Sequence, residues 1–384
     1  MSQNNSGKLR VGIISANWGA VAHLPAWRTL DNVEVTAMCT SRQESAEAAA
    51  KQFGIERPFW SVEAMCADPD IDIIDVGTSP IKRERMVTTA LDAGKHVMNE
   101  MPFAASLEGA RKLVALQHAK GVKGGAGPSV VGMPHVALMK EMIEEGYVGE
   151  VFQVHCSWQM SFFLEIYPGF SYTWFGKAGN GTSLTRNQGS HLLHLLRYLF
   201  GPIDSVVGRM KTQLKTWTLP DDGGTMDVET DDTCHALLNF ASGAMGTLQS
   251  SWTAADCPGF FLDVFGSKGR LRLEALRYPS AETARLYAAK STRNMQPSGA
   301  EIAVPERLFA IDGKVLGSHE QDLWNGGQRI SLARLFSDFA GSIRDGREYP
   351  VTFDRALEVQ AIIEALYESD RRRAWVDIVV PPLS

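Results

Sequence analysis

The sequence predicts an α/β protein in which an N-terminal doubly wound parallel sheet precedes an α+β domain with a large, open, mainly antiparallel sheet. Between residues 9 and 125, short apolar runs alternate with longer amphipathic runs. Beyond about residue 150 the apolar runs become longer and alternating, and few helices separate them. The length of 384 residues fits two domains at about 150 residues each. We therefore expect domains at residues 1–125 and 126–384.

In the first half, each expected strand is bounded by turn residues and followed by a helical pattern. The expected strands are LRVGIIS (9–15), VEVTAMC (33–39), IDIIDVG (71–77) and KHVMN (95–99), and the helices are SAEAAAKQF (45–53), RERMVTTALDAG (83–94) and LEGARKLVALQHAKG (107–121). Near-continuous apolar strands are typical of a sheet buried on both faces. Such a sheet offers a ligand crevice at the carboxyl ends of its strands.

The second half contains longer strands and three helices. The expected strands are VFQVHCSWQM (151–160), SVVGRMKTQ (205–213), TCHALLNF (233–240), GAMGTLQSSW (243–252), FFLDVFG (260–266) and RLRLE (270–274). The expected helices are SHLLHLLRYLFG (190–201), ISLARLFSDFAGSIRDG (330–346) and DRALEVQAIIEALYESDRRR (354–373). Residues 290–327 have no clear periodicity, which favours an extended loop.

Composition and charge exclude several classes of function. With 44 acidic against 38 basic side chains the formal charge is −6, which gives no electrostatic footprint for nucleic acid or an anionic membrane. The five cysteines are scattered without a CxxC pair, which favours reduced thiols over disulfides or zinc, and we expect no metal site. The polar N-terminus lacks an apolar h-region, and no run reaches the length of a membrane span, so the expected location is cytoplasmic.

The turn after the first strand is the first candidate ligand site. A dinucleotide-binding Rossmann fingerprint, G-x-G-x-x-G, is replaced here by Ser15, Asn17 and Ala20. Asn tolerates left-handed dihedral angles and Ser can donate to phosphate, although a turn without a ligand is the alternative. The candidate cofactor-binding residues are Ser15, Ala16, Asn17 and Trp18 on this turn and Gly77, Thr78 and Ser79 after the third strand.

The end of the second strand indicates which dinucleotide is preferred. An NAD enzyme places Asp or Glu there on the ribose hydroxyl, but this chain has Thr40, Ser41 and Arg42. No acid repels a 2′-phosphate, and a guanidinium can pair with one. The expected cofactor is therefore NADP in preference to NAD, although an Arg at a loop tip is often merely solvated.

Five motifs in order carry a family resemblance: VGIISANWGAVAHLPAW (11–27), AGKHVMNEMPFA (93–104), GYVGEVFQV (146–154), NQGSHLLHLLRYLFG (187–201) and VFGSKGRLRLE (264–274). The chain resembles the Gfo/Idh/MocA family of NAD(P)-dependent oxidoreductases, which act mostly on sugars, polyols and other cyclic alcohols. The resemblance implies a Glu-Lys-Pro tripeptide near the nicotinamide, which makes Glu100 and Met101 candidate cofactor-binding residues. It also implies an Asp-x-Gly-x-His run with two further catalytic groups.

The chain departs from that pattern at two catalytic positions. The tripeptide is Glu100, Met101 and Pro102, so a thioether replaces the lysine, and Asn187 replaces the aspartate while His191 is retained. Neither Met nor Asn can transfer a proton. The altered glycine turn and tripeptide also resemble a subgroup that includes the fungal galactose-regulon repressor, a dinucleotide sensor.

The retained histidine is the leading catalytic candidate. The resemblance makes His191 the acid/base that takes the proton of a substrate hydroxyl, with Asn187 as a hydrogen-bonding neighbour; a packed, satisfied histidine is the alternative. His194 either helps to hold the substrate or simply packs, and Arg186 is either a carboxylate clamp or an exposed arginine.

An aromatic tract precedes the histidine helix. Eight aromatic residues fall between Trp158 and Phe175, which favours either packing at a sheet edge or subunit interface, or the wall of a pocket for a ring-shaped ligand. The candidate substrate residues are Trp158, Tyr167, Tyr172, Trp174, Arg186 and His194. Tyr167 or Tyr172 is also a candidate for the proton donor that the absent lysine would have been.

The leading hypothesis is a dehydrogenase or reductase that transfers hydride between nicotinamide and a cyclic secondary alcohol or ketone: a sugar, a polyol or an aromatic-derived dihydrodiol. The alternatives are a catalytically silent dinucleotide or metabolite sensor and an NAD-assisted lyase or glycosidase. The expected partners are a small-molecule substrate and, through the open sheet of the second domain, a second copy of the chain in a homodimer or homotetramer.

Overall fold

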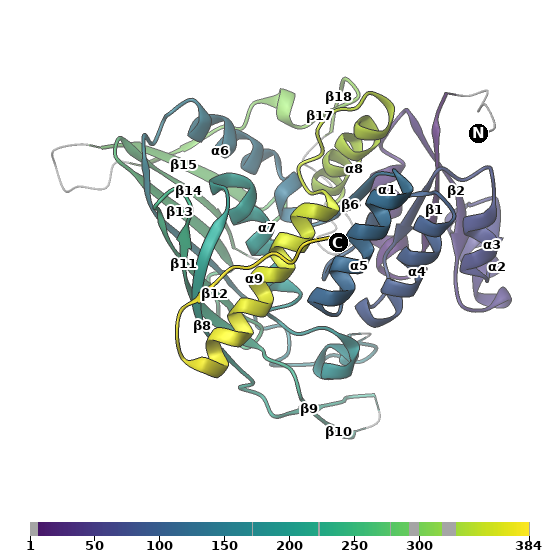
Figure 1. Ribbon diagram of the computed structural model, residues 1–384, viewed down its shortest axis with the longest axis horizontal. Coiled ribbons are helices and arrows are strands. Elements are labelled where there is room, and N and C mark those ends of the chain that lie inside the picture. Colours follow the sequence, from purple (N-terminus) through teal and green to yellow (C-terminus); the bar gives the residue numbers. More distant parts are fainter. Residues whose placement is uncertain are drawn as a thin grey trace. The chain divides into compact units, whose positions relative to one another are not determined.

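The computed structural model describes residues 7–170, 172–221, 223–276, 278–291, 299–316 and 328–383 (Figure 1). The chain divides into two compact units. The first contains Met1–Gly132, Phe309–Leu357 and Pro381–Ser384, and the second contains Met133–Leu308 and Glu358–Val380. The sequence predicted one boundary after residue 125, whereas the chain crosses between the units more than once, because helix α8 (Arg329–Arg344) belongs to the first unit.

Within its described residues the first unit contains a six-stranded parallel sheet with strand order β3-β2-β1-β4-β5-β6. The strands are β1 (Leu9–Ile14), β2 (Val33–Cys39), β3 (Arg57–Phe59), β4 (Ile73–Val76), β5 (His96–Asn99) and β6 (Gly124–Ala126). All four residues of β4 are buried, so both faces of the sheet are covered. The predicted doubly wound sheet is thus confirmed, and its four longer strands lie where the apolar runs placed them.

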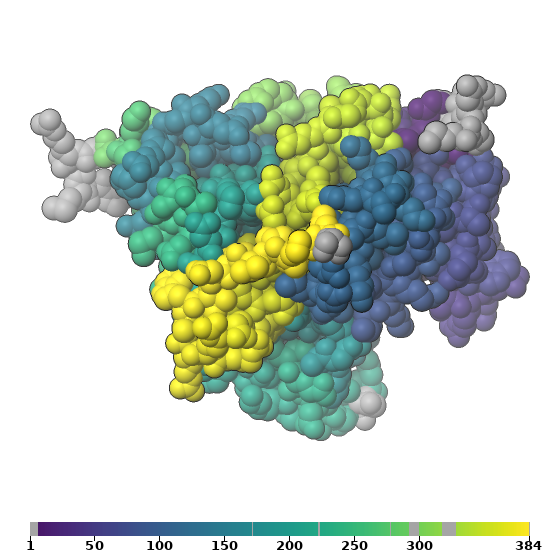
Figure 2. Space-filling model, viewed as in Figure 1, coloured from purple at the N-terminus to yellow at the C-terminus, as the bar shows by residue number. Residues whose placement is uncertain are grey.

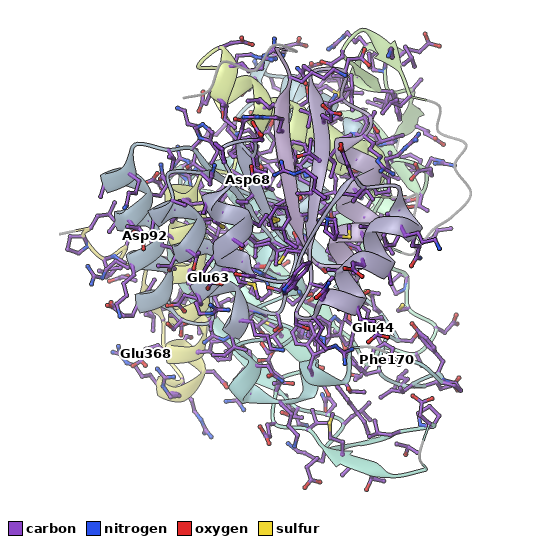
Figure 3. All side chains as sticks on the ribbon, turned by 90° about the vertical axis from the view of Figure 1, so that its right-hand side faces the viewer. Glu44, Glu63, Asp68, Asp92, Phe170 and Glu368 are labelled. Carbon is purple, nitrogen blue, oxygen red and sulfur yellow. The ribbon has the colours of Figure 1, made fainter. Side chains whose placement is uncertain are left out.

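Helices cover this sheet and present acidic side chains to solvent. They are α1 (Leu24–Trp27), α2 (Gln43–Phe53), α3 (Val62–Ala67), α4 (Pro80–Asp92), α5 (Leu107–Lys120) and α8. A π-helical turn at Gly19–His23 directly precedes α1. Helices α3, α4 and α5 pack side by side, and α1 packs against α8. Glu44 on α2, Glu63 on α3 and Asp92 on α4 are exposed (Figure 3).

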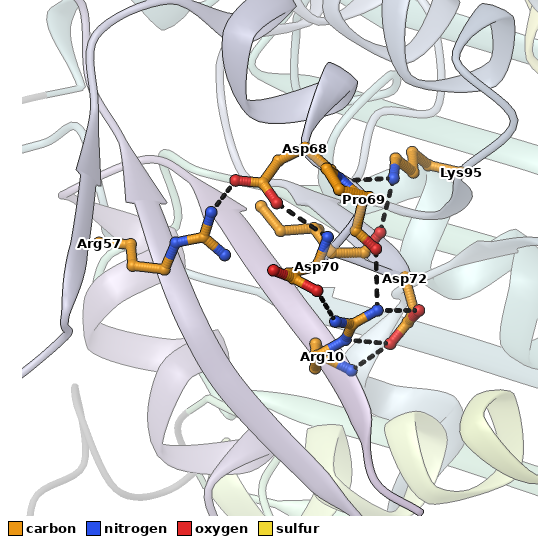
Figure 4. Close-up of polar contacts among 8 residues, drawn as sticks. Arg10, Arg57, Asp68, Pro69, Asp70, Asp72 and Lys95 are labelled. Atoms are coloured by element: carbon orange, nitrogen blue, oxygen red, sulfur yellow. Dashed lines mark hydrogen bonds and ion pairs between the residues drawn. The ribbon is translucent and has the colours of Figure 1, made fainter. Parts of the chain in front are cut away.

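Ion pairs and hydrogen bonds link the loops at the amino-terminal edge of the parallel sheet (Figure 4). The guanidinium of Arg10 donates to both carboxylate oxygens of Asp72 at 3.0 Å and to Asp70 at 2.5 Å. The Lys95 ammonium donates to the carbonyl oxygens of Asp68 and Ile71, each at 2.7 Å. These contacts fix the loop that enters β4, so the polar groups of this edge are used for structure.

The second unit contains a nine-stranded sheet with strand order β16-β15-β14-β13-β7-β12-β11-β8-β19 among its described residues. The strands are β7 (Val151–Gln159), β8 (Ile203–Lys211), β11 (Thr233–Phe240), β12 (Met245–Ser251), β13 (Phe260–Gly266), β14 (Gly269–Ala275), β15 (Ala284–Lys290), β16 (Ala300–Ile302) and β19 (Val376–Asp377). Neighbouring strands are antiparallel except β7 and β12, which are parallel. The expected large, mainly antiparallel sheet is confirmed. A separate hairpin joins β9 (Thr216–Thr218) to β10 (Thr225–Asp227).

Helices α6 (Pro134–Glu144), α7 (Gln188–Phe200) and α9 (Phe353–Arg372) belong wholly or in part to this unit. Helix α7 packs on β12, and α6 packs on β14 and β15. The outer side of α9, in yellow, is visible on the surface in Figure 2. Among the described residues no helix is long and apolar enough to cross a membrane.

The structure adds elements that the sequence did not predict, and it corrects one predicted loop. The strand β15 and the helix α6 were not predicted. The extended loop expected at 290–327 is wrong for its described part, which contains β16, the short hairpin of β17 (Ala310–Ile311) and β18 (Lys314–Val315), and a helical turn. Residues 292–298 and 317–327 lie outside the described residues.

Candidate functional site

The turn after β1 is built by its own polar groups. The Ser15 hydroxyl accepts a hydrogen bond from the Asn17 backbone N–H at 3.1 Å, and the Asn17 carbonyl accepts from the N–H groups of Ala20 and Val21 at 2.9 and 3.0 Å. Helical residues begin directly afterwards at Gly19. The replaced fingerprint therefore still makes a tight turn from strand to helix.

Two glycines bring the β1 and β4 turns together. A Cβ atom on Gly77 would lie 3.1 Å from the Gly19 backbone nitrogen, and one on Gly19 would lie 2.9 Å from Cγ2 of Ile13. The indole nitrogen of Trp18 is buried and has no hydrogen-bond partner among the described residues. A cradle lined by backbone, with an unused donor, fits the diphosphate of a dinucleotide. Gly77 was predicted, whereas Gly19 was missed because the spacing differs from the fingerprint.

The end of β2 carries the residues predicted to choose the cofactor. The Thr40 hydroxyl lies 2.7 Å from the Ser45 hydroxyl and donates to the Arg42 carbonyl at 3.1 Å. Ser41 and Arg42 are exposed, and the Arg42 guanidinium has no partner among the described residues. The first acidic residue after β2 is Glu44, in the first turn of α2 (Figure 3).

A buried arginine that the sequence analysis missed links two of the predicted cofactor segments. Arg83 on α4 is 2% exposed and donates to the carbonyl oxygens of Thr78, Glu100 and Pro102, and to that of Met101 at 3.4 Å. Five N–H groups in one fork can hold several carbonyl oxygens at once. Arg83 therefore ties the turn after β4 to the tripeptide after β5.

His23 and Asp75 lie directly behind the same tripeptide. The His23 Nδ1 atom lies 2.9 Å from both carboxylate oxygens of Asp75, and its Nε2 atom lies 3.7 Å from Oε2 of Glu100. The Trp27 indole N–H donates to Asp75 at 2.6 Å. Burial disfavours a charged imidazole, but Asp75 and then Glu100 raise the pKa of His23 to about 10. Met101 is only 3% exposed, so its thioether packs inside the unit.

In the second unit, the segment that leads into α7 is held by neutral hydrogen bonds around one carboxylate. Asp231 accepts from the backbone N–H and the hydroxyl of Thr185 at 2.9 and 2.6 Å, and from the Tyr367 hydroxyl at 2.6 Å. The Ser183 hydroxyl lies 2.6 Å from the same phenol oxygen. Burial and the Asp231 charge raise the pKa of Tyr367 well above its usual value, so the phenol stays protonated.

Gln188 anchors the first turn of α7 to the sheet, and sequence reasoning also missed it. Its side-chain amide donates to the Trp158 carbonyl and to the Ser250 hydroxyl, each at 2.7 Å, and accepts from the Trp252 indole N–H at 2.9 Å. The side chain is 2% exposed. Because all these partners lie on β7 or near the end of β12, α7 can neither rotate nor slide without breaking buried bonds.

The predicted catalytic residues lie at the start of this anchored helix. Asn187 is the residue that caps α7, and its carboxamide forms no hydrogen bond with any described residue. His191 is buried, with its ring edge-on to Trp158 at a centroid distance of 6.4 Å. His194 is buried too: desolvation, with smaller effects of His191 and Arg197, lowers its pKa to about 3, so it is neutral at ordinary pH.

Arg186 is not the exposed arginine that one reading of the sequence allowed. Its side chain is 18% exposed, and its two terminal nitrogens donate to the Glu364 carboxylate at 2.7 and 3.2 Å. The guanidinium also lies 4.9 Å from the Tyr367 ring centroid. A substrate carboxylate would have to displace Glu364, so the clamp role stays a prediction without support from this unit.

The aromatic tract is largely packed against itself. Phe163 stacks on Trp217 at 4.0 Å, Tyr172 stacks on Phe175 at 5.6 Å, and Phe170 lies edge-on to Phe163. Trp158 instead contacts the His191 ring. Tyr167 is 53% exposed and Trp174 is half-buried. The roles predicted for Tyr167, Tyr172 and Trp174 in substrate binding stay predictions.

No cluster of three metal-ligating side chains occurs in the part of the chain that the structure describes. The structure brings the predicted cofactor residues together at the carboxyl edge of the first sheet, and it groups Trp158, Asn187 and His191 around Gln188 in the second unit.

Two family models match the chain. The "Oxidoreductase family, NAD-binding Rossmann fold" matches residues 9–127, and the "GFO/IDH/MocA C-terminal domain" matches residues 136–272. A D-apiose dehydrogenase of Paraburkholderia graminis is 26% identical over 97% of this chain and 90% of its own length. The NADP(+)-dependent scyllo-inositol 2-dehydrogenase of Bacillus subtilis is 24% identical over 96% of this chain and 95% of its own length. A structure of levoglucosan dehydrogenase with NADH and L-sorbose has a TM-score of 0.85 at 22% identity, over 97% of this chain and 99% of that chain, which shows the shared fold.

Proposed function

The chain belongs to the Gfo/Idh/MocA family of NAD(P)-dependent oxidoreductases, and from this premise we propose that it interconverts a cyclic secondary alcohol of a sugar or polyol with its ketone. The bound nicotinamide supplies the hydride acceptor or donor. The named relatives act on sugars and an inositol, which supports this substrate class. The observation that carries the proposal is a buried histidine, His191, on the first turns of a helix whose start is held by Gln188 and Asp231.

The proton of the substrate hydroxyl goes to His191 in this proposal. The resemblance implies proton-handling groups at positions 101, 187 and 191; neither Met101 nor Asn187 can transfer a proton, so the His191 imidazole is the one of these three that can. Asn187 is free to orient a substrate oxygen by hydrogen bonding. His194 stays neutral and next to His191, so it adds no competing charge.

The test is turnover by the purified chain with NAD⁺ or NADP⁺ and a panel of cyclic polyols and sugars. We expect His191→Ala to lower kcat by about 10²–10⁴-fold, the usual contribution of general acid/base catalysis. His118→Ala, an exposed histidine paired with Asp354, is the matched control and should leave kcat unchanged. Nucleotide binding without turnover, or substrate cleavage without net change of cofactor, would replace the proposal with a sensor or a lyase.

We further propose that the chain prefers NADP. The residues at the carboxyl ends of β1, β4 and β5 would hold the diphosphate and nicotinamide ends, and the exposed Arg42 would meet the 2′-phosphate. Arg42→Ala should raise the Kd for NADPH about tenfold and leave that for NADH within about twofold. Lys51→Ala, which removes a positive charge from the far end of α2, is the control. Tighter binding of NADH than NADPH by the unmodified chain would contradict the preference.

The open face of the nine-stranded sheet is proposed to pair with a second copy of the chain. Leu237 and Met245 are 45% and 61% exposed there. The charged residues of β13 and β14 neutralise one another, since Arg270 and Arg272 pair with Asp263 and Arg272 also pairs with Glu274, so two copies of this face can meet without repulsion. Leu237→Glu combined with Met245→Glu should lower the mass measured by light scattering, whereas Ile81→Glu on α4 should not. The cytoplasmic location stays a prediction.

A further inference from the structure

A buried cluster of four ionisable groups lies under the Glu100–Pro102 segment, and the chemistry proposed above does not use it. Its members come from separate elements: His23 precedes α1, Asp75 lies on β4, Arg83 lies on α4, and Glu100 follows β5. None of them is more than 8% exposed. Buried charges persist only when they are paired or hydrogen-bonded, so the arrangement must balance itself.

The surroundings of the two ring nitrogens of His23 indicate the protonation state of the imidazole. Nδ1 faces both oxygens of Asp75 at 2.9 Å, and Nε2 faces the Glu100 carboxylate at 3.7 Å. A neutral imidazole has one N–H group and one lone pair, so one of its nitrogens would direct a lone pair at a carboxylate. Between two ionised carboxylates, only the imidazolium, with two N–H groups, presents a donor to each side.

We propose that His23 is a buried imidazolium that positions Glu100, and that it supplies beside that carboxylate the positive charge that the thioether of Met101 cannot. The inference about positioning rests on the proposed function, whereas the charge state does not. Glu100 then stays ionised and oriented, because His23 lies behind its carboxylate and Arg83 holds its carbonyl oxygen. His23 acts through Glu100 and is a positioning residue.

The other groups around the cluster agree with this charge state. The Trp27 indole N–H donates to Asp75, and Phe336 on α8 presents its ring to His23 at a centroid distance of 5.3 Å, so neither adds a charge. Tyr349 stays protonated, since burial, with smaller effects of Asp338 and Glu100, raises its pKa well above the usual value. Two cations, His23 and Arg83, thus face two anions, Asp75 and Glu100, and a lysine at position 101 would be a third cation.

The first test needs neither cofactor nor turnover. In nitrogen-15 NMR of the uniformly labelled full chain without nucleotide, both ring nitrogens of His23 should keep imidazolium shifts from about pH 6 to about pH 9, far above the ordinary histidine pKa of about 6.5. His23→Gln identifies the signal. A neutral tautomer at pH 8 would overturn the proposal, whether or not the chain proves to be a dehydrogenase.

The second test asks whether the charge serves Glu100. His23→Gln keeps a donor to Asp75 but removes the charge, and it should lower kcat by about 10- to 100-fold, as misplacement of a catalytic element does. Met101→Lys should also lower kcat in the unmodified chain, yet raise it at least about fivefold in the His23→Gln background. His96→Gln, at the opposite end of β5, is the matched control and should leave kcat within about twofold. A double variant no faster than His23→Gln would overturn the proposal.

Discussion

The two units hold their functional segments by different physics. In the first, the Glu100–Pro102 segment lies on four buried charges, and removal of any one of them leaves the others unbalanced. In the second, the segment from Ser183 to Gln188 is held by uncharged donors around the buried carboxylate of Asp231, and its ion pair, between Arg186 and Glu364, is partly exposed. Each unit also carries one departure from the family pattern: Met101 in the first unit and Asn187 in the second. The comparison teaches that both segments are fixed by residues other than the replaced side chains at positions 101 and 187, so the loss of a proton-handling side chain need not loosen the backbone that carried it.

The largest effect should come from Arg83, because it serves both the charge balance and the main-chain carbonyls. Arg83→Met leaves the carbonyl oxygens of Thr78, Glu100 and Pro102 without their donor and leaves two carboxylates facing one cation. A buried acceptor left without its donor typically costs about 1–3 kcal/mol, and three are left here, so we expect a loss of at least about 3 kcal/mol in the free energy of unfolding measured by chemical denaturation.

Arg85→Met is the matched control for this prediction. Arg85 lies on the same helix, and its side chain is 67% exposed in an ion pair with Glu63, so its removal should change stability little. Equal losses for the two variants would show that the carbonyl contacts of Arg83 contribute little.

Two buried histidines, one in each unit, should also make stability respond to pH in opposite directions. The folded-state pKa of His23 is raised from 6.5 to about 10, so its stabilisation is complete below pH 6.5 and is lost as pH rises toward 10. The folded-state pKa of His194 is lowered to about 3, so its stabilisation is present above pH 6.5 and is lost as pH falls toward 3. One group changes stability by at most about 1.4 kcal/mol per pH unit.

Denaturation curves at a series of pH values measure both slopes. His23→Gln should flatten the alkaline side of the profile and leave the acid side unchanged. His194→Leu should do the reverse. A variant that shifts the whole profile without changing its slope would mean that the histidine concerned does not titrate as the structure indicates.

Local patterns predicted the sheet of the first unit well, since apolar runs such as 71–77 and 95–99 depend only on neighbouring residues. The same patterns predicted the turn at Ser15, because strand ends bring ligand-binding residues to one edge, and the family resemblance pointed to the segment at Glu100. They failed at Arg83, whose surroundings, PIKRER (80–85), have the charge density of a solvent-exposed helix.

What could not be predicted depends on pairs that are far apart in the chain. His23 and Asp75 are 52 positions apart, and Asp231 and Tyr367 are 136 positions apart. A single sequence has no signal for such a pairing. The partner of Arg186 was missed for the same reason, since Glu364 lies in the last helix and Arg186 precedes α7.

The smallest effect is expected from Tyr367, the hydroxyl that joins Asp231 to Ser183. Tyr367→Phe removes one donor from a carboxylate that keeps its two bonds from Thr185, so the free energy of unfolding should fall by only about 1.5 kcal/mol. Because the phenol fixes the segment that leads to Asn187, kcat should fall about fivefold while the Kd of the nucleotide, which the first unit holds, stays constant. Tyr287→Phe, on β15, is the control. If Tyr367→Phe lowers stability but leaves kcat unchanged, the hydrogen bonds around Asp231 only stabilise the second unit. The buried charged groups of the first unit would then be alone in positioning a functional segment.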